Sequence, residues 1–200
     1  MFQGGSQGVT SYESGFTVMR LQHIHLGHQY LIDEAVKMSN VFLVLIGTEK
    51  YTSLRSPFTL ELRLRFLNEI YGDYENIIFA PLYENFTSAK TEWGDYVYNL
   101  AKAHLKQAPE FMIYGSKDKI EDDRKKWYSD SIKKSMVLID KSNPHSISAT
   151  ELREMIINKE YKNWSANVDS SIKGYFHILR SNLLKVYFKQ KEQKKLIQLQ

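Results

Sequence analysis

The sequence predicts an α/β fold in which a parallel sheet carries helices on both of its faces. Five apolar, strand-like runs recur along the chain, and a stretch compatible with a helix separates each run from the next. Alternation of this kind is typical of parallel sheets, because the crossover between two parallel strands is usually a helix. The predicted strands are residues 15–21, 41–46, 77–82, 111–114 and 135–139.

The clearest helical pattern follows the first predicted strand. Apolar side chains recur there at the spacing of one helix face, from Tyr30 and Leu31 through Ala35 to Met38. A further helix is predicted over residues 92–106. These helices cross between parallel strands, so every strand must end at the same edge of the sheet.

The carboxyl ends of the strands should therefore meet, and ligands bind at that edge in folds of this kind. His25, Gly47, Leu82 and Gly115 all follow or end predicted strands there. Side chains on these connections are the first candidates for a functional site.

The two ends of the chain differ from its middle. Residues 1–14 begin with a Gly/Ser/Gln-rich stretch that lacks the basic and apolar regions of a signal peptide, so we expect a leader that is disordered or left over from cloning. Residues 161–200 are predicted to form a C-terminal helical extension packed on the core. Its lysine-rich end is interpreted as a solvated helix face rather than a nucleic-acid contact.

The first functional motif is His25-Leu26-Gly27-His28, which lies at a predicted strand-to-helix turn. Gly27 allows a ligand to approach the backbone, and the first N–H groups of a helix lack helical partners. The helix dipole also favours an anion there, so phosphate is the expected ligand. Taken alone the motif is weak, because histidines at a helix start also cap the helix or pack against its neighbours.

The second motif is the segment 147–153, Ile-Ser-Ala-Thr-Glu-Leu-Arg. Ser148 and Thr150 precede a helical run, and Arg153 lies one turn into it. Two hydroxyls, free backbone amides and a guanidinium can converge on an oligophosphate in this arrangement. Ser and Thr are also ordinary helix caps, so the pair of motifs is more specific than either motif alone. Together they predict a nucleotide enzyme.

Composition restricts the remaining choices. Two hundred residues fit one domain, and a net charge of +4 with a pI near 9.0 suits a polyanionic substrate about as well as it suits nucleic acid. The chain has no cysteine, which excludes disulfides, thiolate metal sites and a cysteine nucleophile. Its longest apolar run, residues 41–46, is far shorter than the roughly 20 residues of a membrane span.

These motifs resemble the nucleotidyltransferases with a His-x-Gly-His signature, and among them the nicotinamide mononucleotide (NMN) adenylyltransferases. The resemblance runs from about residue 16 to residue 160 and rests on residues 19–28, residues 41–47, Ser56-Pro57-Phe58-Thr59 with Arg63, and residues 147–153. It implies a Rossmann-like nucleotidyltransferase domain over residues 15–160. It also implies adenylyl transfer from ATP to NMN with Mg²⁺, giving NAD and pyrophosphate without a covalent enzyme intermediate.

Three residues depart from the family pattern. Met19 replaces a Gly, His23 replaces a Pro, and Leu62 replaces a Glu, although Glu61 is adjacent. These changes bear on the geometry of the substrate pocket and on the rate more than on the reaction type. The pattern is most similar to the adenylyltransferase half of bacterial and bacteriophage proteins that also carry a Nudix hydrolase domain. The sequence holds no Nudix signature, so we expect a stand-alone version or a fragment that lacks a C-terminal Nudix partner domain, and a homo-oligomer stays open.

The resemblance assigns roles around ATP. His25 and His28 hold its phosphates with Gly27, Arg153 holds the β and γ groups with Ser148 and Thr150, and Arg20 contacts the reacting phosphates. No metal ligand is expected from the protein, because nucleotide and water would hold most of the Mg²⁺ coordination sphere. Metal ligation by His25 and His28 with His23 is the alternative. Lys117 and Asp118 either border the adenine and ribose pocket or belong to an exposed loop.

The acceptor side rests on five residues. Gly47 and Thr48 form a shelf after the second predicted strand, and Phe58 and Arg63 belong to the Pro-Phe-Thr segment. In the family a Trp after the third strand lies against the nicotinamide ring, so Trp93 is either that stacking residue or an ordinary core residue.

Two rival functions stay open. The chain could transfer a nucleotidyl group to another phosphate acceptor, such as pantetheine phosphate, flavin mononucleotide, or a sugar or alditol phosphate. It could instead bind adenine nucleotides or NAD without turnover, a reading that Met19, His23 and Leu62 motivate. For every reading we expect a cytoplasmic protein (in the host cytoplasm if a phage encodes it), with no membrane or nucleic-acid partner.

Overall fold

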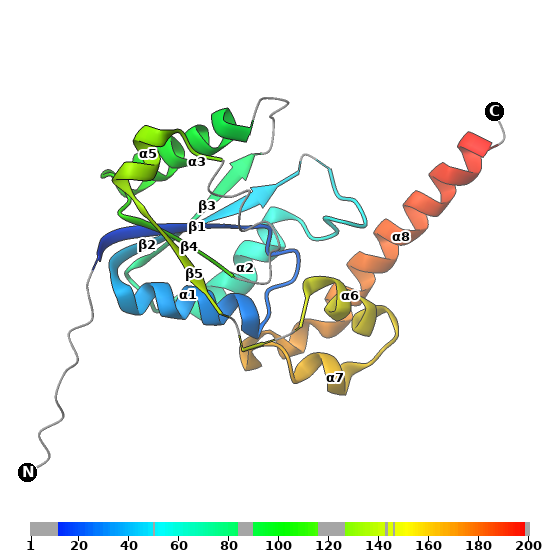
Figure 1. Ribbon diagram of the computed structural model, residues 1–200. Coiled ribbons are helices and arrows are strands. Elements are labelled where there is room, and N and C mark those ends of the chain that lie inside the picture. The colour runs from blue at the N-terminus through cyan, green and yellow to red at the C-terminus, as the bar shows by residue number, and fades with distance from the viewer. Residues whose placement is uncertain are drawn as a thin grey trace, which may run out of the picture.

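The computed structural model describes residues 12–49, 51–83, 90–115, 127–142, 144–145 and 147–198. Five strands form one parallel sheet in the order β3-β2-β1-β4-β5 (Figure 1). The predicted parallel α/β architecture is therefore confirmed. The strands are β1 (Tyr12–Met19), β2 (Ser39–Thr48), β3 (Ile77–Tyr83), β4 (Phe111–Gly115) and β5 (Val137–Lys141).

Helices cover both faces of the sheet, as the alternation predicts. Successive side chains of a strand point to opposite faces, and β2 shows this clearly. Its Phe42 and Val44 join the core beneath α1 (Leu26–Met38) and α2 (Leu60–Tyr71). Its Leu43 joins a second core beneath α3 (Lys90–Leu105), and the short helix α5 (Asp130–Ser135) lies at the edge of that core. β2 is buried on both sides, which explains its continuous apolar sequence.

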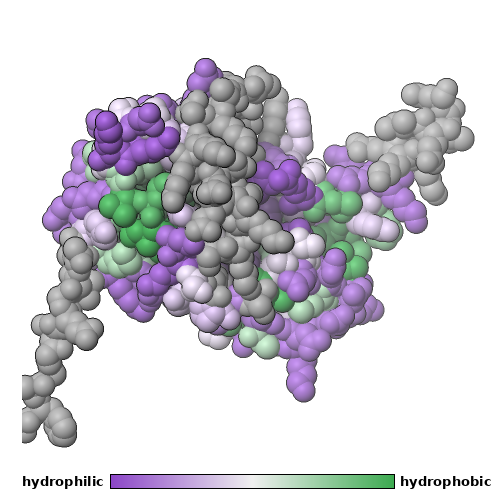
Figure 2. Space-filling view, viewed as in Figure 1, coloured by the Kyte–Doolittle hydropathy of each residue, from purple (hydrophilic) through white to green (hydrophobic). Residues whose placement is uncertain are grey.

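The C-terminal part of the chain forms four helical segments, and the predicted helical extension is confirmed (Figure 1). They are α6 (Ala149–Ile157), α7 (Tyr161–Ser165), the 3₁₀ helix η1 (Ser170–Tyr175) and α8 (Phe176–Gln198). Trp164, Ile172 and Leu179 are buried in the core that α1 and α2 cover. The later part of α8 extends away from the body, and hydrophobic side chains gather where it leaves (Figure 2).

Both ends of β1 and the start of β5 differ from the sequence-based expectation. β1 begins at Tyr12, so residues 12–14 of the predicted leader belong to the sheet, while residues 1–11 lie outside the described residues. β1 also ends at Met19, because Leu21 has a left-handed backbone with φ of 50°. β5 begins at Val137 rather than at residue 135, since Ser135 ends α5.

The strand order places a ligand site between β1 and β4. The chain leaves β1 toward β2 on one side and later returns to add β4 on the other side. Ligands of open parallel sheets bind at this switch point, beyond the carboxyl ends of the strands. The motif His25-Leu26-Gly27-His28 follows β1 there, and Gly115 ends β4. Within the described chain, no helix is long and apolar enough to cross a membrane.

Candidate nucleotide site

His25 shapes the turn between β1 and α1. It is the N-cap of α1 with an extended backbone, and its Nδ1 accepts a hydrogen bond from the Gly27 N–H at 3.1 Å. Its ring packs against the His28 ring, with 3.8 Å between the ring centroids. The cap therefore fixes both imidazoles of the motif on the first turn of α1.

The His28 imidazole is held uncharged. Its pKa lies well below the ordinary value, first because of burial and then because of the charges of His25 and His23. Its Nδ1 is buried and has no hydrogen-bond partner among the described residues. Buried polar atoms in folded proteins are almost always paired, so a ligand is a natural partner here. The other ring nitrogen bonds the His23 backbone, so Nδ1 donates to a phosphate oxygen only when the ring is protonated. An arriving phosphate would also raise the pKa of His28, because a nearby anion favours the charged imidazole.

His23 belongs to the interior rather than to the site surface. Its side chain is 1% exposed, and both ring nitrogens are engaged. Nδ1 donates to the Ile24 carbonyl at 2.7 Å, and Nε2 accepts from the Trp164 indole N–H at 2.7 Å. Burial lowers the pKa of His23 to about 3. Its lone pair is therefore already used, which removes it from any metal site with His25 and His28.

The second motif lies at the start of α6. Ser148 is the N-cap, and its hydroxyl accepts from the Glu151 N–H at 3.2 Å while the Glu151 carboxylate accepts from the Ser148 N–H at 2.8 Å. Thr150 accepts from Arg153 at 3.1 Å between Oγ1 and Nη2. Arg153 is half-buried, which lowers its pKa, and its charge in turn lowers the pKa of His23. Leu152 of α6 is buried in the same core as Ile24, so α6 packs on the same side of the sheet as the first motif.

Arg63 ties together the carboxyl ends of β1 and β2. Its side chain is only 3% exposed, and burial lowers its pKa. Nη1 donates to the carbonyls of Arg20 and Gly47 at 2.6 and 2.8 Å. Nε donates to the Thr59 carbonyl at 3.3 Å, and Nη2 donates to Thr48 Oγ1 at 3.4 Å. Most of its N–H donors are therefore bonded to backbone carbonyls. The main role of Arg63 is to hold the wall of a site together, and binding a ligand directly is secondary.

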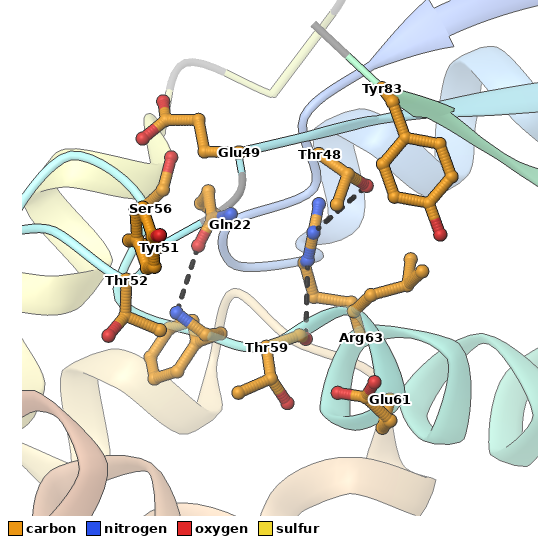
Figure 3. A pocket seen from close by; sticks show the side chains of 12 residues that line it. Gln22, Thr48, Glu49, Tyr51, Thr52, Ser56, Thr59, Glu61, Arg63 and Tyr83 are labelled. Atoms are coloured by element: carbon orange, nitrogen blue, oxygen red, sulfur yellow. Dashed lines mark hydrogen bonds between the residues drawn. The ribbon is translucent and has the colours of Figure 1, made fainter. Parts of the chain in front are cut away.

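A cavity of about 520 Å³ opens beside Arg63 (Figure 3). This volume lies within the usual range of small-molecule sites. Of the five predicted acceptor residues, Thr48, Phe58 and Arg63 line the cavity. Gly47 contacts this lining, because its carbonyl accepts a hydrogen bond from Arg63. The full lining is Gln22, Thr48, Glu49, Tyr51, Thr52, Ser56, Phe58, Thr59, Leu60, Glu61, Arg63 and Tyr83.

Sequence reasoning missed several residues of this cavity. Gln22 holds the loop, because its side-chain carbonyl accepts from the Phe58 N–H at 3.0 Å. Gln22 belongs to residues 19–28, on which the family resemblance rests, and that place was a usable signal. Tyr83 carried no comparable signal, since only the pairing of β2 with β3 brings it beside Thr48.

Trp93 lies on α3 and packs against the second core. Its ring meets the Trp127 ring edge-on, with 4.9 Å between centroids and an angle of 87°. The contact is tight, because a Cβ on the neighbouring Gly94 would come within 1.7 Å of the Trp127 carbonyl oxygen. The described lining of the cavity does not include Trp93, so stacking on a ligand ring stays a prediction. Lys117 and Asp118 lie outside the described residues.

Removing the indole separates the two readings of Trp93. If it stacks on the acceptor ring, as the family resemblance implies, Trp93→Ala raises KM for NMN about 10-fold and leaves KM for ATP nearly unchanged. The melting temperature and both KM values of the one variant provide the measurement. A loss of about 3–5 kcal/mol in stability with no selective weakening of NMN would assign Trp93 to the core instead.

Comparison with solved structures finds the same fold in several proteins of low sequence identity. A bifunctional NMN adenylyltransferase/ADP-ribose pyrophosphatase from Francisella tularensis superposes with a TM-score of 0.72 at 18% identity, over 94% of this chain. A Vibrio parahaemolyticus protein assigned as a nicotinate-nucleotide adenylyltransferase has a TM-score of 0.61 at 14% identity, over 82% of this chain and 98% of its own. This chain has the nucleotidyltransferase fold. The fold-level resemblance that the motifs indicated is thereby confirmed.

Other comparisons set the limits of this likeness. The NadR protein in complex with NAD and AMP-PNP has a TM-score of 0.54 at 17% identity, over 81% of this chain and 46% of its own. The chain spans 57% of the length of the Francisella structure, which has also been solved with AMP and a manganese ion. No protein-family model matches the chain, and no curated protein sequence matches it. At these identities the likeness concerns the fold.

Proposed function

We propose that the chain transfers the adenylyl group of ATP to NMN, giving NAD and pyrophosphate. One observation carries the proposal most: the His25–His28 turn follows β1 at the carboxyl edge of the sheet, α6 is buried in the same core through Leu152, and a polar cavity opens where Gln22 and Arg63 line it. Two groups of phosphate-binding type and an acceptor-sized space are what adenylyl transfer needs. The fold shared with adenylyltransferases supports the same reaction.

The reaction is a direct in-line displacement. An oxygen of the NMN 5′-phosphate attacks the α-phosphorus of ATP, a new P–O bond forms, and the bond to the β-phosphate oxygen breaks as pyrophosphate leaves. A phosphate oxygen is an adequate nucleophile, so catalysis comes from positioning and from donors aimed at the developing charge. His28 with His25 donates to the ATP phosphates, and Arg153 holds the leaving pyrophosphate. Arg20 contacts the reacting phosphates in this scheme, and the proposed roles of Lys117 and Asp118 at the adenosine concern residues outside the described ones.

Mg²⁺ fits this scheme as a metal carried by the nucleotide. Among the described residues no group of three or more His, Cys, Asp or Glu side chains could hold a metal ion, so a protein cage is not part of the proposal. Such an ion prefers phosphate oxygens and water, and it would neutralise charge on the leaving pyrophosphate. The manganese ion in the Francisella complex supports a divalent metal in this fold.

The charge of the cavity favours NMN over nicotinate mononucleotide. Glu49 and Glu61 both line it, and hydrogen bonds from the Glu61 backbone and Thr59 hold the pKa of Glu61 below its ordinary value. The Arg63 donors that could attract a carboxylate are bonded to carbonyl groups instead. A nicotinate carboxylate would therefore meet two carboxylates and one guanidinium whose donors are already used, whereas the neutral amide of NMN adds no further negative charge.

An acceptor screen tests the reaction. Purified chain with Mg²⁺ and either ATP or CTP is offered NMN, pantetheine phosphate, flavin mononucleotide and sugar phosphates, and pyrophosphate release is followed. We expect the highest kcat/KM for ATP with NMN. Turnover of another acceptor would move the assignment within the nucleotidyltransferases. Tight NAD binding without pyrophosphate release from any pair would support the non-catalytic reading and reject ours.

The role of charge in acceptor choice gives a sharper prediction. Wild-type chain should prefer NMN over nicotinate mononucleotide by about 10-fold in kcat/KM, which corresponds to roughly 1.4 kcal/mol. Glu49→Gln removes one of the facing charges and should narrow that ratio about threefold or more. Glu75→Gln alters an exposed carboxylate ahead of β3, at the opposite edge of the sheet, and serves as the control. An unchanged ratio in Glu49→Gln would place the acceptor ring elsewhere.

A further inference from the structure

We propose that the hydrogen bond from Trp164 to His23 is a positioning contact, which holds the His25–His28 turn in place for adenylyl transfer. The inference rests on the proposed function. His23 acts through the turn rather than on the substrate, so it is a positioning residue. His23 stands at a position where the family that the chain resembles carries a Pro.

The two hydrogen bonds of the imidazole fix a single tautomer. The Ile24 carbonyl oxygen only accepts, so Nδ1 carries the hydrogen. The indole N–H of Trp164 only donates, so Nε2 must offer a lone pair. Both demands are met by the same neutral ring, and both partners lie 2.7 Å away. Protonating the ring would break the bond to Trp164, so this contact requires an uncharged His23.

Two more hydrogen bonds link the first turn of α1 to the same stretch of chain. The Leu26 N–H donates to the Asn167 carbonyl at 3.0 Å, and the Gln29 side-chain amide donates to the Asp169 carboxylate at 3.1 Å. Residues 164–169 thus bond both to the loop that precedes α1 and to the first turn of α1. We call this segment the brace. It contacts the chain immediately before, within and after the His25–His28 turn.

The brace also joins the two phosphate motifs. It begins in α7, which follows α6, and Trp164 is fully buried in the same core as Leu152 and Ile156 of α6. On its other side the His23 ring meets the Phe58 ring edge-on at 6.0 Å, and Phe58 lines the cavity. One imidazole therefore contacts the first motif, the cavity loop and the brace.

This arrangement replaces a backbone constraint with side-chain hydrogen bonds. A Pro would fix φ at this position of the turn. His23 has no pyrrolidine ring to fix φ, and the two hydrogen bonds of its imidazole restrain the turn instead. Catalysis by positioning is sensitive to shifts of about 1 Å, so a loosened turn should slow turnover while leaving substrates bound.

Trp164→Phe tests the contact, because it removes the N–H and keeps an aromatic ring in the core. We expect kcat to fall about 10-fold or more, with KM for ATP and NMN changed by less than about threefold. The control is Phe176→Leu, which alters a ring 5.1 Å from Trp164 that offers no N–H to His23. Both variants should lower the melting temperature, but only Trp164→Phe should lower kcat at a temperature where both are folded. Equal kcat in the two variants would overturn the proposal.

Imidazole NMR keeps this test separate from the proposed function. The chain has six histidines, and the exposed His104 on α3 serves as the internal reference. Trp164→Phe should shift the signals of His23, His25 and His28 and leave that of His104 unchanged. If wild-type chain makes no NAD, the proposed function fails, and the NMR result alone decides on the brace. Unmoved His25 and His28 signals would then refute it.

Discussion

Replacing His28 with Ala lowers kcat for NAD formation by about 100-fold or more, while KM for NMN changes little. The His28 Nδ1 is buried without a partner among the described residues, and it lies on the turn where the ATP phosphates are proposed to bind. Removal of one preorganised donor to a developing charge typically costs this much. Steady-state rates of pyrophosphate release for variant and wild type provide the measurement.

The matched control is His104→Ala, which removes an exposed imidazole on α3. It should keep wild-type kcat and melting temperature. Near-normal turnover in His28→Ala would show that the first motif serves only to shape the fold. A large fall in melting temperature, with kcat restored at lower temperature, would lead to the same conclusion.

Arg63→Lys lowers the free energy of unfolding by about 2–4 kcal/mol, although the charge is kept. The guanidinium donates to the carbonyls of Arg20, Gly47 and Thr59 in a nearly closed environment, and an ammonium group cannot reproduce this fork. The ends of β1 and β2 should separate, so KM for NMN should rise about 10-fold. Urea unfolding and acceptor kinetics on the same preparation measure both effects.

Arg65→Lys is the natural comparison on the same helix. The Arg65 guanidinium lies over the Tyr175 ring, 4.9 Å from its centroid, on the exposed side of α2. We expect a stability loss of less than about 1 kcal/mol and unchanged kinetics. If the two variants lose equal stability, the hydrogen bonds of Arg63 to the backbone do not support the cavity wall.

Much of the fold can be predicted from the sequence, because burial on both faces leaves continuous apolar strands. β2 is the plainest example. Two boundaries could not be predicted. Leu21 adopts a left-handed backbone, which usually requires Gly. Because the residue here is Leu, the sequence contains no signal for the end of β1. α5 is six residues long and has no fully buried side chain, so it carries too little periodicity to separate it from β5.

The two helix starts of the candidate site are where local residue chemistry is informative. Ser148 is an N-cap of a preferred residue type, and His25 caps α1 although imidazole is not among the preferred caps. The partners of His23 and Arg63 were not predictable. His23 meets Trp164 across 141 residues, and Arg63 bonds to backbone carbonyls that any sequence would present. Such contacts depend on how the helices pack, and no regular residue spacing in the sequence indicates them.

The fate of the α-phosphorus tests the central claim most directly. Wild-type chain is mixed with a limiting amount of ATP labelled at the α-phosphate, excess NMN and Mg²⁺, and the reaction is quenched over one turnover. Direct in-line transfer predicts that the label passes from ATP into NAD with one pyrophosphate released per NAD, and that none becomes attached to the protein. Label that stays in ATP, or that appears on the chain before NAD forms, would contradict the mechanism.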